Sequence, residues 1–217
     1  MGEFNAGEID YNNPPFPLTA IDREVLATRD EDYHRITWQE LKHITATNAL
    51  EQLKRLPSDL HRYLAWSYNI KKRYGGITNY VVQERLHWTP DPTRSDKGPV
   101  FEHKSDVPFT ERSDYVVLMN DWPYGLEEGI VHLVAWSKTP IAVDDERGDV
   151  TPESRTLIEG FVRSYFVKAL GEEGHERVTW FKNWVSLQSV RGVDHVHVLV
   201  KDAPAALLEH WTERKDL

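Results

Sequence analysis

The spacing of hydrophobic and polar positions predicts two kinds of structure along the chain. In the first 88 residues, apolar side chains recur at approximately helical intervals. One helix is expected to begin at the capping box formed by Thr37 and Glu40, and Pro57 separates it from the next. That second helix stops near Gly75, and a third is expected over residues 78–86. The beginning of the chain is therefore predicted to be helical.

After a polar, proline-containing loop at residues 89–112, the pattern changes to short apolar runs. A helix opened by Thr151 and Pro152 separates two pairs of predicted strands. The order predicts an α+β fold in which an antiparallel sheet has one main covering helix and the helical N-terminal region covers one side. The predicted strands are 115–119, 130–136, 178–184 and 195–200, and a short helix is expected within 203–215. The predicted organisation is an extended arm at 1–17 and a single domain at 18–217, made of a helical region (18–88) and an α+β core (113–217).

Composition narrows the class of protein. Asp and Glu number 35 against 26 Lys and Arg, a net charge of −9, which opposes general binding to nucleic acid. Cysteine is absent, so disulfides and thiolate chemistry are excluded. No secretory signal and no membrane-spanning run are seen. We expect a cytoplasmic protein whose partner is a small molecule rather than nucleic acid or membrane.

The segment with the clearest chemical character is a His-x-His pair. In a strand, His195 and His197 share one face, roughly 6.5–7 Å apart, and Val196, Val198 and Val200 take the other. Two such imidazoles can ligate a metal, act as a nucleophile and its supporter, or line a solvent-facing strand. The residues alone leave these alternatives open.

Two stretches together resemble the histidine-triad and galactose-1-phosphate uridylyltransferase superfamily. The first runs from Tyr115 to Gly125 and on through His132 to Lys138. The second contains Asn183, then Gln188-Ser189-Val190, then His195-Val196-His197. The resemblance covers roughly residues 113–200, and it implies a sheet that handles phosphate esters.

Carried over, the resemblance makes His197 the nucleophile at an α-phosphorus and His195 its orienting or phosphate-binding neighbour. It makes Asn183, Gln188 and Ser189 contacts to phosphate or ribose. An alternative register makes His195 the central histidine. The run departs from the superfamily at its third position, where Leu199 replaces His or Gln, and this departure weakens the case for catalysis.

Most of residues 18–202 also resembles a fungal family named for an N-acetylglucosamine-induced protein. The similar segments are Leu18–Asp22, Arg55–Leu60, Arg85–Trp88, Trp180–Asn183 and Ser186–Val190. The resemblance implies a fungal, cytoplasmic protein linked by regulation to amino-sugar supply. It implies no particular reaction.

Several further residues are candidates for binding a ligand. Lys182 and Asn183 lie between aromatic residues and can hold a phosphate, and Asn120 with Trp122 can form a shelf beside the site. His132 lies inside an apolar strand and is expected to be a core or supporting residue. Three cationic side chains within residues 55–62 surround a helix start. They could bind a phosphate there, or they could simply belong to a capped, solvent-exposed helix end.

The leading hypothesis is an enzyme that handles a nucleotide, a nucleotide sugar or a sugar phosphate at the His-x-His strand. One alternative is a non-catalytic sensor or binding protein on the same scaffold. Another is a metal site in which His195 and His197 are joined by His87, His103 or His132, or by a carboxylate. Nothing in the sequence points to a particular cofactor or oligomeric state.

Overall fold

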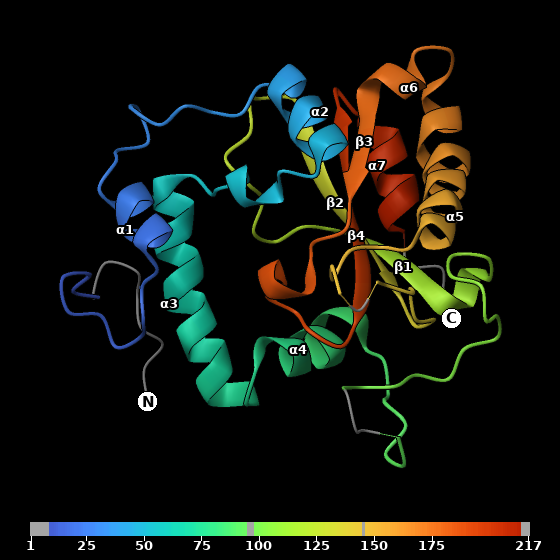
Figure 1. Cartoon of the computed structure of the whole chain (residues 1–217), viewed down its shortest axis with the longest axis horizontal. Helices are drawn as coiled ribbons and strands as arrows, with labels where there is room; N and C mark the ends of the chain where they lie inside the picture. The colour runs from blue at the N-terminus through green and yellow to red at the C-terminus, as the bar shows by residue number, and fades with distance from the viewer. Residues whose placement is uncertain (1–8, 95–97, 145, 214–217) are drawn as a thin grey trace.

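The computed structural model describes residues 9–94, 98–144 and 146–213. Its centre is a four-stranded antiparallel sheet with the order β1-β2-β4-β3 (Figure 1). The α+β class predicted from the sequence is confirmed. The strands are β1 (Tyr115–Met119), β2 (Ile130–Ser137), β3 (Val178–Phe181) and β4 (Asp194–Lys201).

The register of the sheet fixes the surroundings of the His-x-His pair. On β4, His197 lies opposite Val134 of β2 and Phe181 of β3, and His195 lies opposite Trp136 of β2. Because helical segments cover this face of the sheet, both imidazoles lie inside the molecule, 5% and 7% exposed for His195 and His197. The hypothesis of a solvent-facing histidine pair is therefore wrong.

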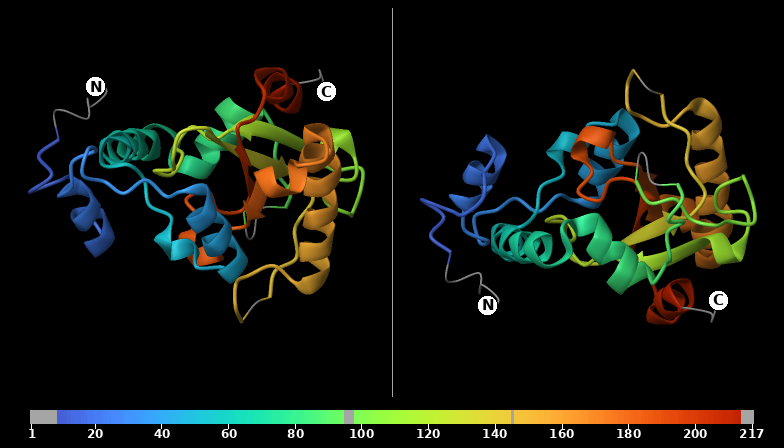
Figure 2. Two further views of the ribbon diagram at one scale, coloured as in Figure 1. Left: turned by 90° about the horizontal axis from the view of Figure 1, so that it is seen from above. Right: turned by 90° about the horizontal axis from the view of Figure 1, so that it is seen from below.

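One face of the sheet carries an aliphatic and aromatic core. The helix predicted from Thr151 is α5 (Pro152–Val162), which continues through η5 (Arg163–Val167) and η6 (Lys168–Leu170). Together with α7 (Ala205–Thr212) it covers this face, as Figures 1 and 2 show. Val196, Val198 and Val200 are fully buried against these helices, as the alternation of the strand predicts.

The N-terminal helices cover the opposite face, which carries the histidines. A cluster around α2 (Trp38–Thr47) and η2 (Leu50–Gln52) packs on Phe181 and Leu199. A second cluster around α4 (Ile77–Tyr80) and η3 (Val81–Leu86) packs on Val134 and Trp136. The long helix α3 (Pro57–Tyr74) stands to one side of the sheet (Figure 2).

Two short helices were not predicted. The first, α1 (Ala20–Leu26), begins with a capping box in which Thr19 and Asp22 bond each other reciprocally. Asp replaces the usual Glu or Gln there, and the helix buries only Val25, so its hydrophobic pattern is weak. The second, α6 (Gly174–Arg177), is a single turn before β3.

The described parts of the predicted arm and loop are packed against the body. The Tyr11 hydroxyl donates to the carbonyl of His61 on α3 at 2.8 Å. In the loop, Phe101 and Phe109 are buried, and the segment ends in η4 (Arg112–Asp114) before β1. The buried Asp114 carboxylate accepts the backbone N–H groups of Lys104 and Ser105 at 2.8 and 2.9 Å.

Residues 1–8 of the arm lie outside the described residues, and the domain boundaries stay a prediction. None of the helices in the described part of the chain is both long and apolar enough to cross a bilayer.

Candidate functional site

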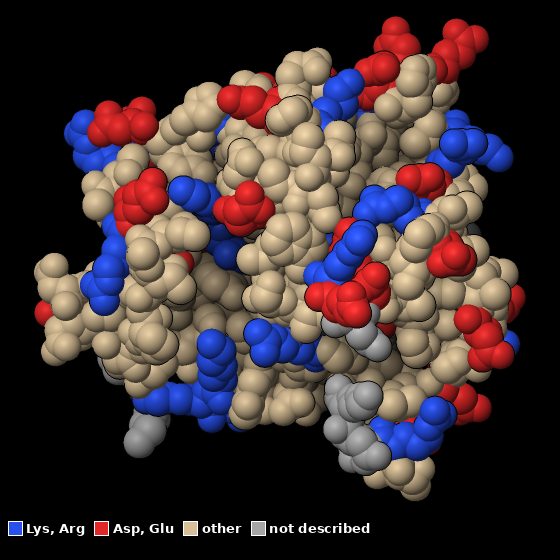
Figure 3. All heavy atoms as spheres, in the orientation of Figure 1, with Lys and Arg blue, Asp and Glu red and all other residues tan. Residues whose placement is uncertain are grey.

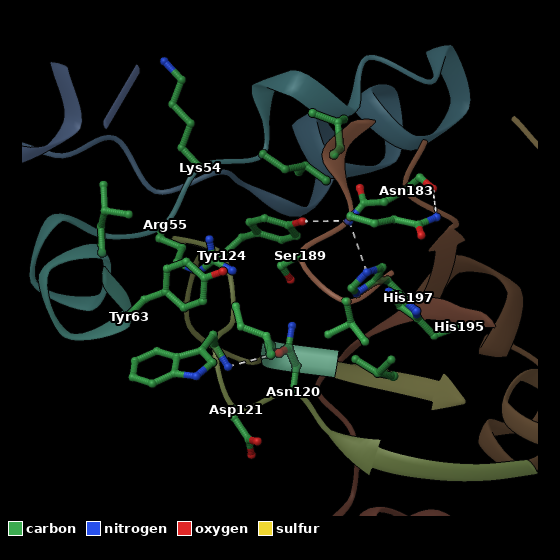
Figure 4. A pocket seen from close by; sticks show the side chains of 18 of the residues that line it. Lys54, Arg55, Tyr63, Asn120, Asp121, Tyr124, Asn183, Ser189, His195 and His197 are labelled. Carbon is green, nitrogen blue, oxygen red and sulfur yellow. Dashed lines mark hydrogen bonds between the residues drawn. The ribbon is translucent and has the colours of Figure 1, made fainter. Parts of the chain in front are cut away.

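A cavity of about 490 Å³ opens between α3, the α4–η3 pair, the histidine face of the sheet and η7 (Val185–Leu187). In the space-filling view this face is hollowed beside α3, and basic atoms border the hollow (Figure 3). Figure 4 shows both histidines of β4 at one end of the pocket and Arg55 with Tyr63 toward the other. The lining therefore joins the predicted histidine pair to the helical N-terminal region.

His197 is held by hydrogen bonds at both ring nitrogens. With the Asn183 amide turned so that Nδ2 donates to Nε2 of His197 at 3.2 Å, the ring proton lies on Nδ1. Nδ1 then donates to Nε2 of His132 at 2.9 Å. The ring also stacks on Phe181, with centroids 4.7 Å apart. Neither nitrogen of His197 is left for a ligand unless Asn183 or His132 moves.

His195 is bonded differently. Its Nδ1 lies 2.8 Å from the carbonyl oxygen of Val193, which can only accept, so Nδ1 carries the proton. Its Nε2 is then an acceptor, and it has no hydrogen-bond partner among the residues that the structure describes. The ring packs on Trp136, with centroids 4.5 Å apart, and lines the cavity.

Burial keeps all three imidazoles of this face neutral. It lowers the pKa of His132 to about 3, and the nearby Arg55 cation acts in the same direction. Burial lowers the pKa of His195 to about 4, although the bond to the Val193 carbonyl opposes this. The pKa of His197 is well below its usual value, first through burial, then through the adjacent imidazoles of His132 and His195, and last through the nearby cations. At neutral pH the polar end of the pocket therefore carries no charge on its histidines.

Arg55 is the cation that the pocket leaves without an anionic partner. Of the three cationic side chains in the lining, Lys54 pairs with Glu24 at 3.6 Å and Arg85 with Asp121 at 2.7 Å. Arg55 forms no ion pair within the described ranges. Its guanidinium carbon lies 3.9 Å from the Tyr63 ring centroid, and its buried Nε has no hydrogen-bond partner.

The turn that carries Arg55 is pinned by backbone contacts. Gly125 N–H donates to the carbonyl of Lys54 at 2.9 Å, and the Tyr33 hydroxyl donates to the same oxygen at 3.2 Å. A Cβ on Gly125 would lie 2.6 Å from the Tyr33 ring and 3.1 Å from Leu56 N, so only glycine allows this close approach. The position of Arg55 is thus fixed by chain segments far apart in sequence.

The helix start beside Arg55 is not an open anion site. The Asp30 carboxylate accepts the backbone N–H of Ser58 at 2.8 Å and the Ser58 hydroxyl at 2.5 Å. Arg62, a second cation of this stretch, points to solvent and pairs with Asp59. The helix N-terminus considered as a phosphate subsite is therefore occupied by Asp30, and Arg55 is a cation of the stretch that lines the cavity.

Aromatic rings form the wall between Arg55 and the histidines. Trp122 packs on Trp66 and Tyr63, with ring centroids 5.2 and 5.6 Å apart. Tyr124 stacks on His132 at 5.3 Å, and the Arg55 guanidinium lies 5.9 Å from the Tyr124 ring centroid. Such rings offer flat apolar faces, with a polar edge on Tyr and Trp, to a sugar ring or a base.

The structure brings most of the candidate residues from the sequence together. The cavity lining includes His195, His197, Asn183, Gln188, Ser189, Asn120 and Trp122.

Two of these candidates have evident structural bonds. Gln188 Nε2 donates to the carbonyl of Asn183 at 2.8 Å, and Asn120 Oδ1 accepts the N–H of Trp122 at 3.0 Å. His132, expected as a core or supporting residue, is 3% exposed and supports His197.

Lys182 lies outside this lining. Its ammonium forms an ion pair with Asp194 at 3.0 Å, and its side chain is only 4% exposed. β3 ends at Phe181, three residues earlier than predicted, but the alternation continues through the next two positions. Phe181 and Asn183 contact His197, so the intervening Lys182 points away from it.

The residues that sequence reasoning missed are the aromatic wall members Tyr63 and Trp66 and the particular role of Arg55. Tyr63 and Trp66 have helical spacing that also suits an ordinary core face. In the sequence, Arg55 is marked only as one of three cations around a helix start. Its orientation toward the cavity depends on the contact of this turn with Gly125, which no local sequence signal reveals.

The metal hypothesis gains no support from side-chain positions. Among the described residues, no three His, Asp or Glu side chains are grouped as a metal site requires. His87 and His103 line a different cavity, where their Nδ1 atoms lie 2.8 and 3.0 Å from the carbonyl oxygens of Gln83 and Phe101.

Comparisons with known proteins agree with one of the two resemblances. The family model described as "Protein of unknown function (DUF3605)" matches residues 37–201. N-acetylglucosamine-induced protein 1 of Candida albicans (strain SC5314 / ATCC MYA-2876) is 33% identical over 175 residues, covering 76% of this chain and 68% of that protein.

Two further matches extend over most of the chain. An uncharacterized protein of Saccharomyces cerevisiae (strain ATCC 204508 / S288c) is 30% identical over 182 residues, covering 83% of this chain and 86% of that protein. The crystal structure of HTC1 superimposes with a TM-score of 0.59 at 29% identity, covering 80% of this chain and 91% of that one.

Proposed function

Because the chain belongs to the DUF3605 family, whose function is unknown, we propose a role from its own pocket: it binds a small phosphorylated ligand. The ligand class is a sugar phosphate, a nucleotide or a nucleotide sugar. Its anionic group would lie on Arg55 and its ring against the aromatic wall. In this proposal the protein is a binding protein or sensor first, and catalysis is a second candidate.

The observation that carries the proposal is the unpartnered Arg55 guanidinium in a cavity. An arginine that is partly buried without a carboxylate loses hydration and gains no ion pair in return. Its buried Nε, which lacks a partner, adds a cost of about 1–3 kcal/mol. A planar guanidinium matches the oxygens of a phosphate group, and a bound phosphate would compensate the cation.

The carboxylates of the lining do not take this role. Asp22 is engaged in the capping box of α1, and Asp121 pairs with Arg85. Glu51 is exposed. The anionic partner of Arg55 is therefore proposed to come from outside the chain.

The name of one relative directs the choice of first probes. The Candida albicans protein is called N-acetylglucosamine-induced protein 1, so amino-sugar phosphates are tested beside nucleotides and nucleotide sugars. N-acetylglucosamine itself serves as the uncharged counterpart of N-acetylglucosamine 6-phosphate. If the phosphate is what Arg55 binds, only the phosphorylated member of this pair should bind tightly.

The experiment is a thermal-shift screen of these probes, because a ligand that binds only the native state raises the melting temperature. Arg55→Met removes the guanidinium and keeps an unbranched side chain, and Arg62→Met makes the same change at an exposed site outside the cavity. We expect a shift with a phosphorylated probe that is lost in Arg55→Met and retained in Arg62→Met. Equal shifts in both variants, or no shift with any phosphorylated probe, would refute the proposal.

The second candidate is phosphoryl or nucleotidyl transfer, as the resemblance to the histidine-triad superfamily implies. Its support is the neutral state of the imidazoles at the pocket, since a neutral imidazole is a competent nucleophile. Against His197 as nucleophile stands the bonding of both its nitrogens. The test is release of product from any ligand found in the screen: recovery of unchanged ligand supports binding alone, and turnover that His197→Ala leaves intact excludes that residue as nucleophile.

A further inference from the structure

The two histidines of β4 are equivalent in sequence spacing but not in their bonding. His197 uses Nε2 toward Asn183 and Nδ1 toward His132. His195 uses only Nδ1, toward the Val193 carbonyl. A strand places both rings on one face, so this difference comes from what the neighbouring segments supply.

The tautomer of His195 is set by the backbone. A carbonyl oxygen can only accept, so the 2.8 Å contact holds the proton on Nδ1 and leaves a lone pair on Nε2. Trp136 packs against the ring and holds its orientation. The result is a fixed, neutral acceptor in the lining of the cavity.

The cavity therefore has two chemically different ends. At one end the Arg55 guanidinium offers donors and positive charge. At the other, His195 offers an acceptor. Tyr124 lies between them, 5.9 Å from the guanidinium carbon and 6.5 Å from the ring centroid of His197, which neighbours His195 at 5.3 Å.

We infer that His195 is the residue that selects the ligand at the end of the pocket away from Arg55, by accepting a hydrogen bond from a ligand hydroxyl or amide N–H at Nε2. This inference rests on the proposed function and narrows its ligand class. The ligand carries an anionic group at one end and a hydrogen-bond donor at the other. A phosphorylated sugar has this chemistry, whereas an inorganic anion without a donor fills only the Arg55 end.

His197, His132 and Asn183 then have a structural role. Their hydrogen bonds fix the orientation of the His197 ring, which lies beside His195. In this assignment His195 is a specificity residue and His197 a positioning residue. The two roles separate in a binding experiment.

The experiment compares two probes on the full chain by isothermal titration. N-acetylglucosamine 6-phosphate has both an anionic group and donors, and sulfate has the charge without a donor. His195→Phe keeps an aromatic ring but loses the acceptor, and His195→Gln keeps an acceptor near the position of Nε2. Because one hydrogen bond contributes on the order of 1 kcal/mol, the expected loss of sugar-phosphate affinity in His195→Phe is about fivefold.

The predicted pattern is a sugar-phosphate affinity that falls about fivefold in His195→Phe and stays within about twofold of the wild type in His195→Gln, with sulfate affinity unchanged in both. Unchanged sugar-phosphate affinity in His195→Phe would overturn the inference. An equal loss for both probes would also overturn it, since His195 would then act on the pocket as a whole. Failure of the proposed function gives a different result from failure of this inference. In that case the wild type would bind neither probe, or Arg55→Met would bind both as the wild type does.

Discussion

Lowering the pH from 7 to 5 should destabilise the fold strongly, because three neutral histidines are buried on one sheet face. Their pKa values are lowered to about 3 for His132 and about 4 for His195, and well below the usual value for His197. In the unfolded chain each has an ordinary pKa of about 6.5. Between these values the unfolded state binds more protons, so stability is lost as the pH falls through this window.

The magnitude follows from linkage. At pH 5, protonation stabilises the unfolded state by about 2 kcal/mol per histidine, whereas a native histidine with a pKa at or below about 4 gains almost nothing. His132 and His195 together give a loss of about 4 kcal/mol, a large part of the stability of many domains. His197, whose pKa is also lowered, adds to this loss in the same direction. His61, whose pKa burial also lowers, adds to the loss in the same direction.

The assay is urea unfolding followed by tryptophan fluorescence at several pH values between 5 and 6.5, with eight tryptophans as reporters. We expect the free energy of unfolding to fall by more than about 2 kcal/mol per pH unit near pH 5.5, the share of His132 and His195 alone. His197→Gln should reduce this slope, and His43→Gln, at an exposed residue, should leave it unchanged. A wild-type slope of about 1 kcal/mol per pH unit or less would refute the reasoning, because it corresponds to a single histidine.

Two further predictions concern the residues that hold the site. Gly125→Ala should lower the free energy of unfolding by about 1–3 kcal/mol, because the new Cβ would meet Tyr33 and Leu56. It should also weaken ligand binding by moving the turn that carries Arg55. Chemical denaturation measures the first effect and titration calorimetry the second, and stability equal to the wild type would contradict the close packing. Asp194→Ala should lower the free energy of unfolding by about 3 kcal/mol, because it leaves the buried Lys182 ammonium unpaired. Adding Lys182→Met to the same chain should recover part of this loss. A double variant no more stable than Asp194→Ala in urea unfolding would count against a buried ion pair.

The class of fold could be predicted from the sequence because its signals are local. The Thr37–Glu40 capping box begins α2 as expected, with both reciprocal bonds present. The alternation of β4 correctly separated its valines from its histidines. The helix opened by Thr151 and Pro152 also begins where predicted.

The candidate site was harder to predict because its geometry depends on long-range contacts. Lys182, which was predicted to bind a ligand, lies in a buried ion pair outside the cavity lining. Side chains alternate between the two faces from Phe181 onward, so Lys182 points away from the face on which Phe181 contacts His197. Whether Arg55 faces solvent or the cavity depends on Gly125, seventy residues later in the chain. The different roles proposed for His195 and His197 depend on Val193, Asn183 and His132, of which only Val193 is a near neighbour in sequence.

The most direct test of the central claim is a crystal structure of the protein with the phosphorylated probe that gives the largest thermal shift. We predict electron density for the phosphate within hydrogen-bond distance of the Arg55 guanidinium and for the ligand ring against Trp122 or Tyr124. Density for the phosphate elsewhere on the protein, with the cavity empty of ligand, would contradict the proposed binding mode.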